Sequence, residues 1–232
     1  MERSTGGERV AGYRVDRILE AVERFRGNWR RYHRPDDVNH LLRQFRKVDL
    51  QRGYVLDYIA LGSSESGWIW PFARRDTPGT NAELPSVLRE IPSDRLASEG
   101  RAGSLHSVAV QSLYRYLSFE RSPQGLFEYA YFINELWATK SPGRESDWLS
   151  LVPLLVRHKF DAVLRREADR LVRVSKPDHY DPLVFVEGAG GRVQFLAYQS
   201  GPWKRIIRLA LKVEDDGSVG WQPLDVVASL SR

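Results

Sequence analysis

The sequence predicts a mixed α+β fold, in which amphipathic and buried helices pack on an antiparallel sheet. In the N-terminal half, apolar residues recur every three or four positions, which is the spacing of a helix. From Leu183 onward the apolar period changes to two, which is the spacing of a strand. With 232 residues the chain is long enough to bury a sizeable core. We therefore expect a single domain over residues 1–232, with a weaker alternative of a boundary within 76–104 or 140–146.

The composition is that of a folded protein without cysteine chemistry. Hydrophobic residues make up 42% of the chain and charged residues 28%, and both fractions are ordinary for a globular protein. The absence of cysteine excludes disulfides, cysteine-ligated zinc and a thiol nucleophile, and it favours a reducing, cytoplasmic location. No run of apolar residues approaches the roughly 20 that a transmembrane helix needs, so we expect no transmembrane segment.

The first predicted elements are two helices. Apolar residues between Val10 and Tyr32 fall at steps of three and four, which indicates one stripe of a long amphipathic helix. Pro35 ends this helix, and Asp36 or Asp37 can cap a second one. The apolar face of the second helix comprises Val38, Leu41, Leu42 and Phe45.

A β-hairpin is predicted next in the N-terminal half. Tyr54–Leu61 and Trp68–Ala73 are rich in β-branched and aromatic residues, and a Gly-Ser-rich turn separates them. Pro71 indicates that the second run is an edge strand or ends early. The residues that follow, 76–104, are poor in large apolar side chains, and a long irregular stretch of this kind is often a binding loop, a lid or a linker.

The remaining chain is predicted to form three helices and then a β-meander. One helix runs from Ser104 to about Phe119, and a second begins at Pro123, is apolar nearly all round and runs to about Ala138. A third begins near Ser146, with a kink at Pro153. The strands of the meander are Leu183–Glu187, Arg192–Gln199, Lys204–Val213 and Val219–Trp221.

The favoured functional interpretation is a non-enzymatic module that binds a protein or a small ligand and needs no cofactor. No catalytic signature, phosphate loop or metal-ligand set stands out in the sequence. Trp68, Trp70 and Arg74 adjoin the 76–104 stretch, and if exposed they would form a stacking platform for a ligand. If buried, the same tryptophans are core residues.

The first alternative is a nucleic-acid-binding protein. Lys and Arg outnumber Asp and Glu by twelve to eight over residues 1–50 and by twelve to six over 150–212. In the predicted meander, Arg208 and Lys212 alternate onto one face of their strand, and Arg192 occupies an alternating position on the neighbouring strand. If the strand registers agree, this face is basic and suited to nucleic acid. The competing interpretation is an ordinary solvated outer face.

The second alternative is a metal-assisted hydrolase or nucleotidyl-handling enzyme. Asp178, His179 and Asp181 lie within four residues and include three metal-ligating or acid–base side chains, although the prolines on either side favour a simple turn. Glu128 and Glu135 lie seven residues apart on the apolar helix. They indicate either acid–base chemistry or a structural pairing with an arginine such as Arg115.

The tryptophan hypothesis is tested by substitution. We expect Trp68→Ala or Trp70→Ala to weaken partner binding without unfolding the protein, because the hypothesis places both indole rings on the surface. Binding is measured by a pull-down titration and folding by circular dichroism. A variant that loses its folded spectrum would show that its tryptophan belongs to the core.

Overall fold

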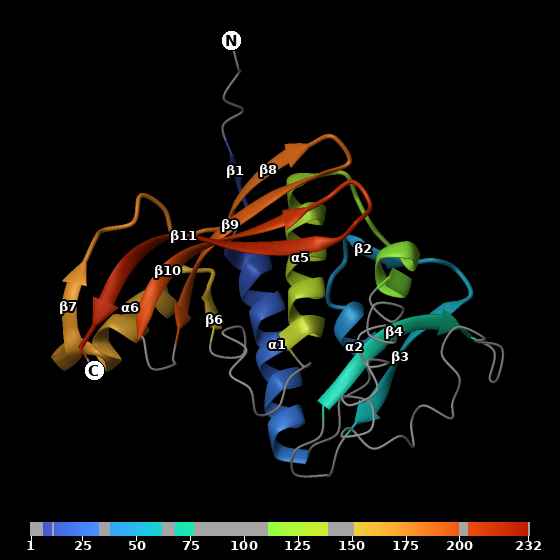
Figure 1. The fold of residues 1–232 in the computed structure, drawn as a ribbon, viewed down its shortest axis with the longest axis horizontal. Helices are drawn as coiled ribbons and strands as arrows, with labels where there is room; N and C mark the ends of the chain where they lie inside the picture. Colours follow the sequence, from blue (N-terminus) through green and yellow to red (C-terminus); the bar gives the residue numbers. More distant parts are fainter. Residues whose placement is uncertain are drawn as a thin grey trace, which may run out of the picture.

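The computed structural model describes residues 7–10, 12–32, 38–61, 68–76, 111–138, 151–199 and 204–231. Over these residues the fold is mixed α+β, with a large curled antiparallel sheet (Figure 1). No helix in this part of the chain is long and apolar enough to cross a membrane. Nearly all of the 76–104 stretch and all of 140–146 lie outside the described residues, so the single-domain prediction stays a prediction.

The two N-terminal helices are α1 (Gly12–Tyr32) and α2 (Val38–Leu42). Both begin where the periodicity predicted them. The predicted stripe of α1 is buried over the part whose side chains are described, namely Val15, Ile18, Leu19, Val22 and Phe25. The apolar face of the second helix and the turn after it is also buried, at Val38, Leu41, Leu42 and Phe45.

The predicted hairpin is formed by β3 (Tyr54–Leu61) and β4 (Trp68–Arg75). Strand β4 continues through Pro71, which pairs with Tyr58. This is tolerated because, among the described residues, β3 and β4 make a two-stranded sheet in which each strand keeps an open edge. The Asn39 side chain attaches the hairpin to α2, because its amide group bonds both the carbonyl oxygen (2.8 Å) and the backbone N–H (2.7 Å) of Leu56.

The helix that was predicted to run to about Phe119 ends earlier in the structure. Residues 111–116 are helical, but β5 (Leu117–Phe119) replaces the last three residues of the predicted helix. Strand β5 pairs with β2 (Val48–Leu50), which gives both segments a partner for their backbone groups. The helical spacing of apolar residues continues into 117–119, so periodicity alone did not reveal this change.

The buried helix is α5 (Pro123–Ala138), with the predicted start and end. The Ser122 hydroxyl caps it by accepting a hydrogen bond from the Gly125 backbone N–H at 3.2 Å. Every residue from Gly125 to Leu136 is buried, including the acidic side chains of Glu128 and Glu135. A helix that is buried on all sides must be surrounded by other elements.

The large sheet contains the predicted meander and three further strands. Its order is β1-β8-β9-β10-β11-β7, and β6 also pairs with β9. All pairings are antiparallel, and β11 continues well past Trp221. The strands are β1 (Glu8–Arg9), β6 (Leu151–Leu154), β7 (Leu171–Val174), β8 (Leu183–Glu187), β9 (Gly190–Gln199), β10 (Arg205–Val213) and β11 (Val219–Leu230).

The helix predicted near Ser146 was wrong from Leu151 onward. Strand β6 lies there and pairs with β9, with Pro153 opposite Ala197. Among the described residues β6 has one neighbouring strand, and an edge position accommodates a proline that cannot donate to a ladder. Pro153 was therefore the residue that indicated a strand at the edge of a sheet. The spacing of the leucines was misleading because it fits both a helix and a strand.

Helices contact both faces of the sheet. On one face, α5 lies against β8, β9 and β10, and the ring of its Tyr131 is 6.5 Å from that of Phe195. On the opposite face, which we call the outer face, α6 (Arg157–Arg166) packs with a second buried cluster. The prediction of helices on one face missed α6. The apolar outer-face positions that it helps to bury are Leu154, Leu196, Tyr198 and Ile206.

The packing around α5 is tested by truncation. Phe132 is fully buried, and its ring lies 4.9 Å from that of Phe45. We expect Phe132→Ala to lower the free energy of unfolding by about 3–5 kcal/mol, because it leaves a cavity in a closed core. Val186→Ala is the control: Val186 is 44% exposed, so the change should stay within about 0.5 kcal/mol. Urea denaturation measures both variants, and equal losses would contradict the packing described here.

Candidate functional site

The strand registers place the predicted basic residues on one face. Lys212 of β10 lies directly opposite Arg192 of β9, and Ala210 lies opposite Gln194. Arg208 lies opposite Leu196, which is also an outer-face residue. The registers therefore agree, as the nucleic-acid hypothesis required, and Arg192, Arg208 and Lys212 all occupy the outer face beside the region that α6 covers.

A chain segment crosses this face and brings a histidine to it. The segment begins beside β11, where the Ser175 N–H donates to the Val227 carbonyl oxygen at 2.8 Å. It ends beside β1, where the Pro182 carbonyl oxygen accepts from the Val10 N–H at 3.2 Å. Within it, the ring of Tyr180 packs at 5.2 Å against Phe160 of α6. The segment therefore passes over the outer face and carries His179 with it.

His179 lies among positive charges. Burial lowers the pKa of His179 below its ordinary value, and the charges of Arg208 and Arg9 lower it further. Asp178 and Asp181 oppose this shift without overcoming it. The imidazole is thus held in its neutral form near pH 7. The sequence presented His179 as part of a possible metal site and Arg208 as part of a basic sheet face. The structure brings these two candidates close enough for their charges to interact.

Two arginines on the outer face have an unmet hydrogen-bond donor. The guanidinium carbon of Arg192 lies 4.8 Å from the centre of the Phe185 ring. Arg208 approaches Asp225 at 3.5 Å from its Nε, but the geometry is not that of a hydrogen bond. In the described part of the chain, the Nε–H groups of both arginines are buried and have no acceptor. A buried donor without a partner costs about 1–3 kcal/mol, so this site favours an added acceptor.

Three basic residues occupy register positions around Gln194. Leu183 pairs with Gln194 on one side and with Arg9 on the other, so Arg9 lies two strand spacings, about 10 Å, from Gln194. Arg192 is two residues away on the same strand, and Arg208 is a diagonal neighbour on β10. The Arg192 guanidinium extends toward Phe185 on β8, whereas Arg208 extends toward Asp225 on β11. We call Arg9, Arg192 and Arg208 the arginine cluster.

Acidic residues border this cluster and limit its extent. Lys212 pairs with Glu214 at 2.7 Å, and this hydrogen bond raises the lysine pKa. Asp225 lies beside Arg208 and is about half exposed. Glu214 and Asp225 therefore offset part of the positive charge that the sequence predicted for this face.

The metal-site candidates gain no support from this geometry. Among the residues that the structure describes, no three histidine or acidic side chains gather closely enough to hold a metal ion. The charges that Arg9 and Arg208 exert on His179 would also repel a cation. We therefore do not develop the metal hypothesis for Asp178, His179 and Asp181 further.

Glu128, one of the two buried glutamates of α5, is held by structural hydrogen bonds. The Glu128 carboxylate accepts a hydrogen bond from the Lys47 backbone N–H at 2.8 Å and from the Gln124 side chain at 2.7 Å. The bond from Lys47 attaches α5 to the turn after α2. The sequence had instead predicted a salt bridge between a glutamate of this helix and an arginine. Glu135 accepts a longer bond, 3.4 Å, from Asn134. Neither arrangement points to acid–base chemistry.

The hairpin candidates are described in part. The Nε–H of Arg74 donates to Asp57 at 2.7 Å, across the hairpin, and its Nη1 donates to the carbonyl oxygen of Arg75. Arg74 is therefore occupied within the hairpin. The side chains of Trp68 and Trp70 lie outside the described part of the structure, so the binding role of the tryptophans stays a prediction.

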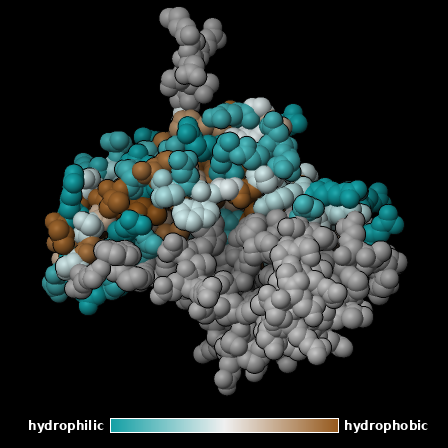
Figure 2. All heavy atoms as spheres, in the orientation of Figure 1, coloured by the Kyte–Doolittle hydropathy of each residue, from teal (hydrophilic) through white to brown (hydrophobic). Residues whose placement is uncertain are grey.

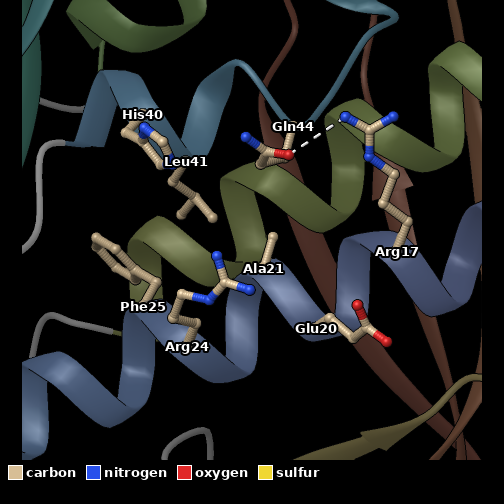
Figure 3. A pocket seen from close by; sticks show the side chains of 8 residues that line it. All are labelled: Arg17, Glu20, Ala21, Arg24, Phe25, His40, Leu41 and Gln44. Atoms are coloured by element: carbon tan, nitrogen blue, oxygen red, sulfur yellow. Dashed lines mark hydrogen bonds between the residues drawn. The ribbon is translucent and has the colours of Figure 1, made fainter.

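A small pocket between α1 and α2 was not predicted (Figure 3). It measures about 200 Å³, with Ala21, Phe25 and Leu41 as its apolar part. Arg17 lies at one end and donates to Gln44 at 3.4 Å. Ligand pockets are usually larger, roughly 300–1,000 Å³. No sequence motif announces this pocket, because it arises where two separate helices meet. The remaining lining residues are Glu20, Arg24 and His40.

Comparisons of the chain with protein-family models, with curated proteins and with solved structures found no match. The function must therefore be argued from the residues of this chain. Of the surfaces described above, the arginine cluster combines neighbouring basic residues with unmet buried donors, and it is the strongest candidate.

The structural role of Glu128 is testable. We expect Glu128→Ala to lower the free energy of unfolding by about 1–3 kcal/mol, because the Lys47 N–H loses its buried acceptor. Glu23→Ala is the control, since Glu23 forms an exposed pair with Lys159 that contributes about 0–1 kcal/mol. Chemical denaturation reports both values. If Glu128→Ala proved no more costly than Glu23→Ala, the hydrogen bond to α5 would have no stabilising role.

Proposed function

We propose that the protein is a non-enzymatic binding module that holds an oxyanion, the phosphate or carboxylate group of a ligand, on the outer face of its sheet. The observation that carries this proposal is the pair of buried Nε–H groups of Arg192 and Arg208, which have no acceptor among the described residues. An anion bound beside either group would supply its missing acceptor and offset part of the positive charge.

The chemistry of the arginine cluster favours an oxyanion over a neutral ligand. Guanidinium groups present planar sets of donors that match carboxylate and phosphate oxygens, and such charge-assisted bonds are stronger than neutral ones. Arg9 adds a third cation two strands away from Gln194. His179, which is neutral and half-buried, adds a ring nitrogen able to donate a hydrogen bond.

The size of the site favours a single anionic group over a long nucleic-acid strand. The three arginines occupy register positions around Gln194, and the nearby Lys212 is paired with Glu214. A polyanion extending past Arg208 would meet the half-exposed carboxylate of Asp225. Nucleic acid remains one source of the phosphate group, and the salt dependence of binding distinguishes it from a small ligand.

We expect the protein to bind sulfate, used as a simple oxyanion probe, and to lose this binding on substitution. Arg208→Ala and Arg192→Ala should each weaken sulfate affinity about tenfold or more, because each removes a charge-assisted bond. Arg173→Ala, which removes an exposed arginine on β7, should leave the affinity unchanged. Isothermal titration calorimetry measures the affinities, and equal effects of all three substitutions would refute the site.

The same titration has a predicted pH dependence. Burial lowers the His179 pKa, and Arg208 and Arg9 lower it further, so a bound anion that offsets the charge of the two arginines must raise it. Binding then takes up a proton, so sulfate affinity increases as the pH falls through the histidine range, while sulfate itself does not titrate there. His179→Gln should abolish this increase. An unchanged pH profile in that variant would show that His179 is not part of the site.

A parallel titration with labelled single-stranded and duplex nucleic acid separates the two sources of phosphate. A small-anion site predicts weak nucleic-acid binding whose salt slope corresponds to about two or three phosphate contacts. A much steeper slope, lost in the Arg192 and Arg208 variants, would replace the small-ligand proposal with an extended nucleic-acid surface.

A further inference from the structure

Three cations gather around one buried carboxylate at one end of the sheet. Glu167 directly follows α6 and is buried. Its carboxylate oxygens lie 3.3 Å from Nε of Arg166, 3.6 Å from Nζ of Lys204 and 4.0 Å from Nη1 of Arg170. Both arginine side chains are more than half exposed. One negative charge thus offsets one of three positive charges, and two positive charges remain in excess.

The residues that follow α6 add to this positive charge. Residues 165–176 contain five basic and two acidic residues, and Glu167 is one of the two acids. The basic residues of this range outside the carboxylate cluster are Arg165, Arg173 and Lys176, and all three are exposed. This end of the sheet therefore carries a net positive charge even before Lys204 is counted.

Two exposed valines lie on one side of the edge strand β7. Val172 is the most exposed large hydrophobic side chain in the described part of the chain, at 69%, and Val174 is exposed at 44%. Val174 lies opposite Ala228, which belongs to the buried cluster of the outer face. Because side chains alternate along a strand, Val172 points to the same side as Val174. The two valines therefore share the outer-face side of β7.

Backbone pairing places these valines beside the cations. The Leu230 N–H donates to the Lys204 carbonyl oxygen at 3.2 Å, and Leu230 pairs with Leu171 on its other side. Lys204 therefore lies two strand spacings, about 10 Å, from Leu171, which immediately precedes Val172. The Arg170 carbonyl oxygen is held at the same place, because it accepts from the Ser231 N–H at 2.7 Å.

The cations lie on the same side of the sheet as the valines. Glu167, which they surround, accepts a hydrogen bond at 3.0 Å from the hydroxyl of Tyr198, an outer-face residue. Figure 1 shows α6, β7 and the C-terminus together at one end of the sheet, and Figure 2 shows hydrophobic and hydrophilic residues side by side there. We define the α6–β7 surface as Arg166, Arg170, Lys204, Val172 and Val174.

We propose that the α6–β7 surface docks the protein on a membrane that contains anionic lipids. A basic surface alone would suit nucleic acid equally well, but phosphates offer no apolar partner to Val172. A membrane uses both features, because the valines enter the boundary between headgroups and acyl chains while the cations remain at the level of the anionic headgroups. The charge of this surface is thus complementary to the proposed partner, and its exposed valines distinguish that partner from nucleic acid.

The size of the surface makes this association weak and reversible. Two valines bury little apolar area, and each basic residue close to an anionic membrane strengthens binding by about fivefold. Added salt screens the attraction, so binding should weaken as the salt concentration rises. Arg192 and Arg208 are not part of the α6–β7 surface, so membrane docking does not depend on the anion site.

Co-sedimentation of the full chain with vesicles tests the proposal. The wild type should bind vesicles of phosphatidylcholine mixed with phosphatidylserine about tenfold more tightly than vesicles of phosphatidylcholine alone. Val172→Asp should weaken binding to the anionic vesicles about fivefold or more, because it brings a negative charge to an anionic surface. Val186→Asp is the matched control and should have no effect, since Val186 is an exposed valine on β8. Equal binding of the wild type to both kinds of vesicle, or no binding to either, would overturn the proposal.

Two further variants separate docking from damage to the fold, which circular dichroism monitors. Val172→Trp should strengthen binding to the anionic vesicles about threefold or more, because an indole ring buries more apolar area at the interface. Arg170→Gln should weaken it about fivefold, because it removes one cation. A Val172→Trp variant that is folded but binds no better than the wild type would contradict insertion of this side chain.

The same assay distinguishes the α6–β7 surface from two other sources of binding. Arg192→Ala should leave vesicle binding unchanged, and a loss as large as that of Arg170→Gln would move the lipid headgroup to the arginine cluster. Labelled single-stranded nucleic acid serves as the second probe. If Arg170→Gln weakened nucleic-acid binding of a protein that bound no vesicles, the surface would be a nucleic-acid site and the membrane proposal would be wrong.

Discussion

The burial of α5 on all sides is the constraint on which the rest of the structure depends. A helix with no polar face is stable only when other elements enclose it. Here the strands β8, β9 and β10 lie on one side, and β2, β5 and the turn after α2 lie on others. Polar contacts fix its position, since the Tyr129 hydroxyl donates to the Gly217 carbonyl oxygen at 2.8 Å and Glu128 accepts from the Lys47 N–H. This helix connects the N-terminal and C-terminal parts of the chain, together with the pairing of β1 with β8.

The position of α5 also determines the character of the outer face. Once Val193, Phe195 and Leu211 point toward the core that contains α5, strand alternation sends Arg192, Gln194 and Lys212 to the opposite side. Helix α6 covers the apolar part of that side, and residues 175–182 cross what remains. The arginine cluster is therefore a consequence of sheet register, and its unmet donors are what distinguish it from an ordinary solvated face.

The sequence predicted the elements better than it predicted the site. Long periodic segments and the Ser122-Pro123 start signal located α1 and α5, and two-residue alternation located the meander. Strands β5 and β6 were mistaken for helix because short apolar runs fit both periods. The meeting of His179 with Arg9 and Arg208 was not predictable, because it depends on a crossing segment and on a two-residue strand, β1.

The most direct test of the central claim observes the arginine side chains themselves. A sulfate titration followed by 1H–15N correlation spectra of arginine Nε–H groups reports which guanidinium groups gain an acceptor. The account predicts saturable shifts of the Arg192 and Arg208 signals, assigned through single substitutions, with the signals of Arg17 and Arg24 in the α1–α2 pocket unchanged. Shifts confined to Arg17 and Arg24 would move the site to that pocket and contradict the account.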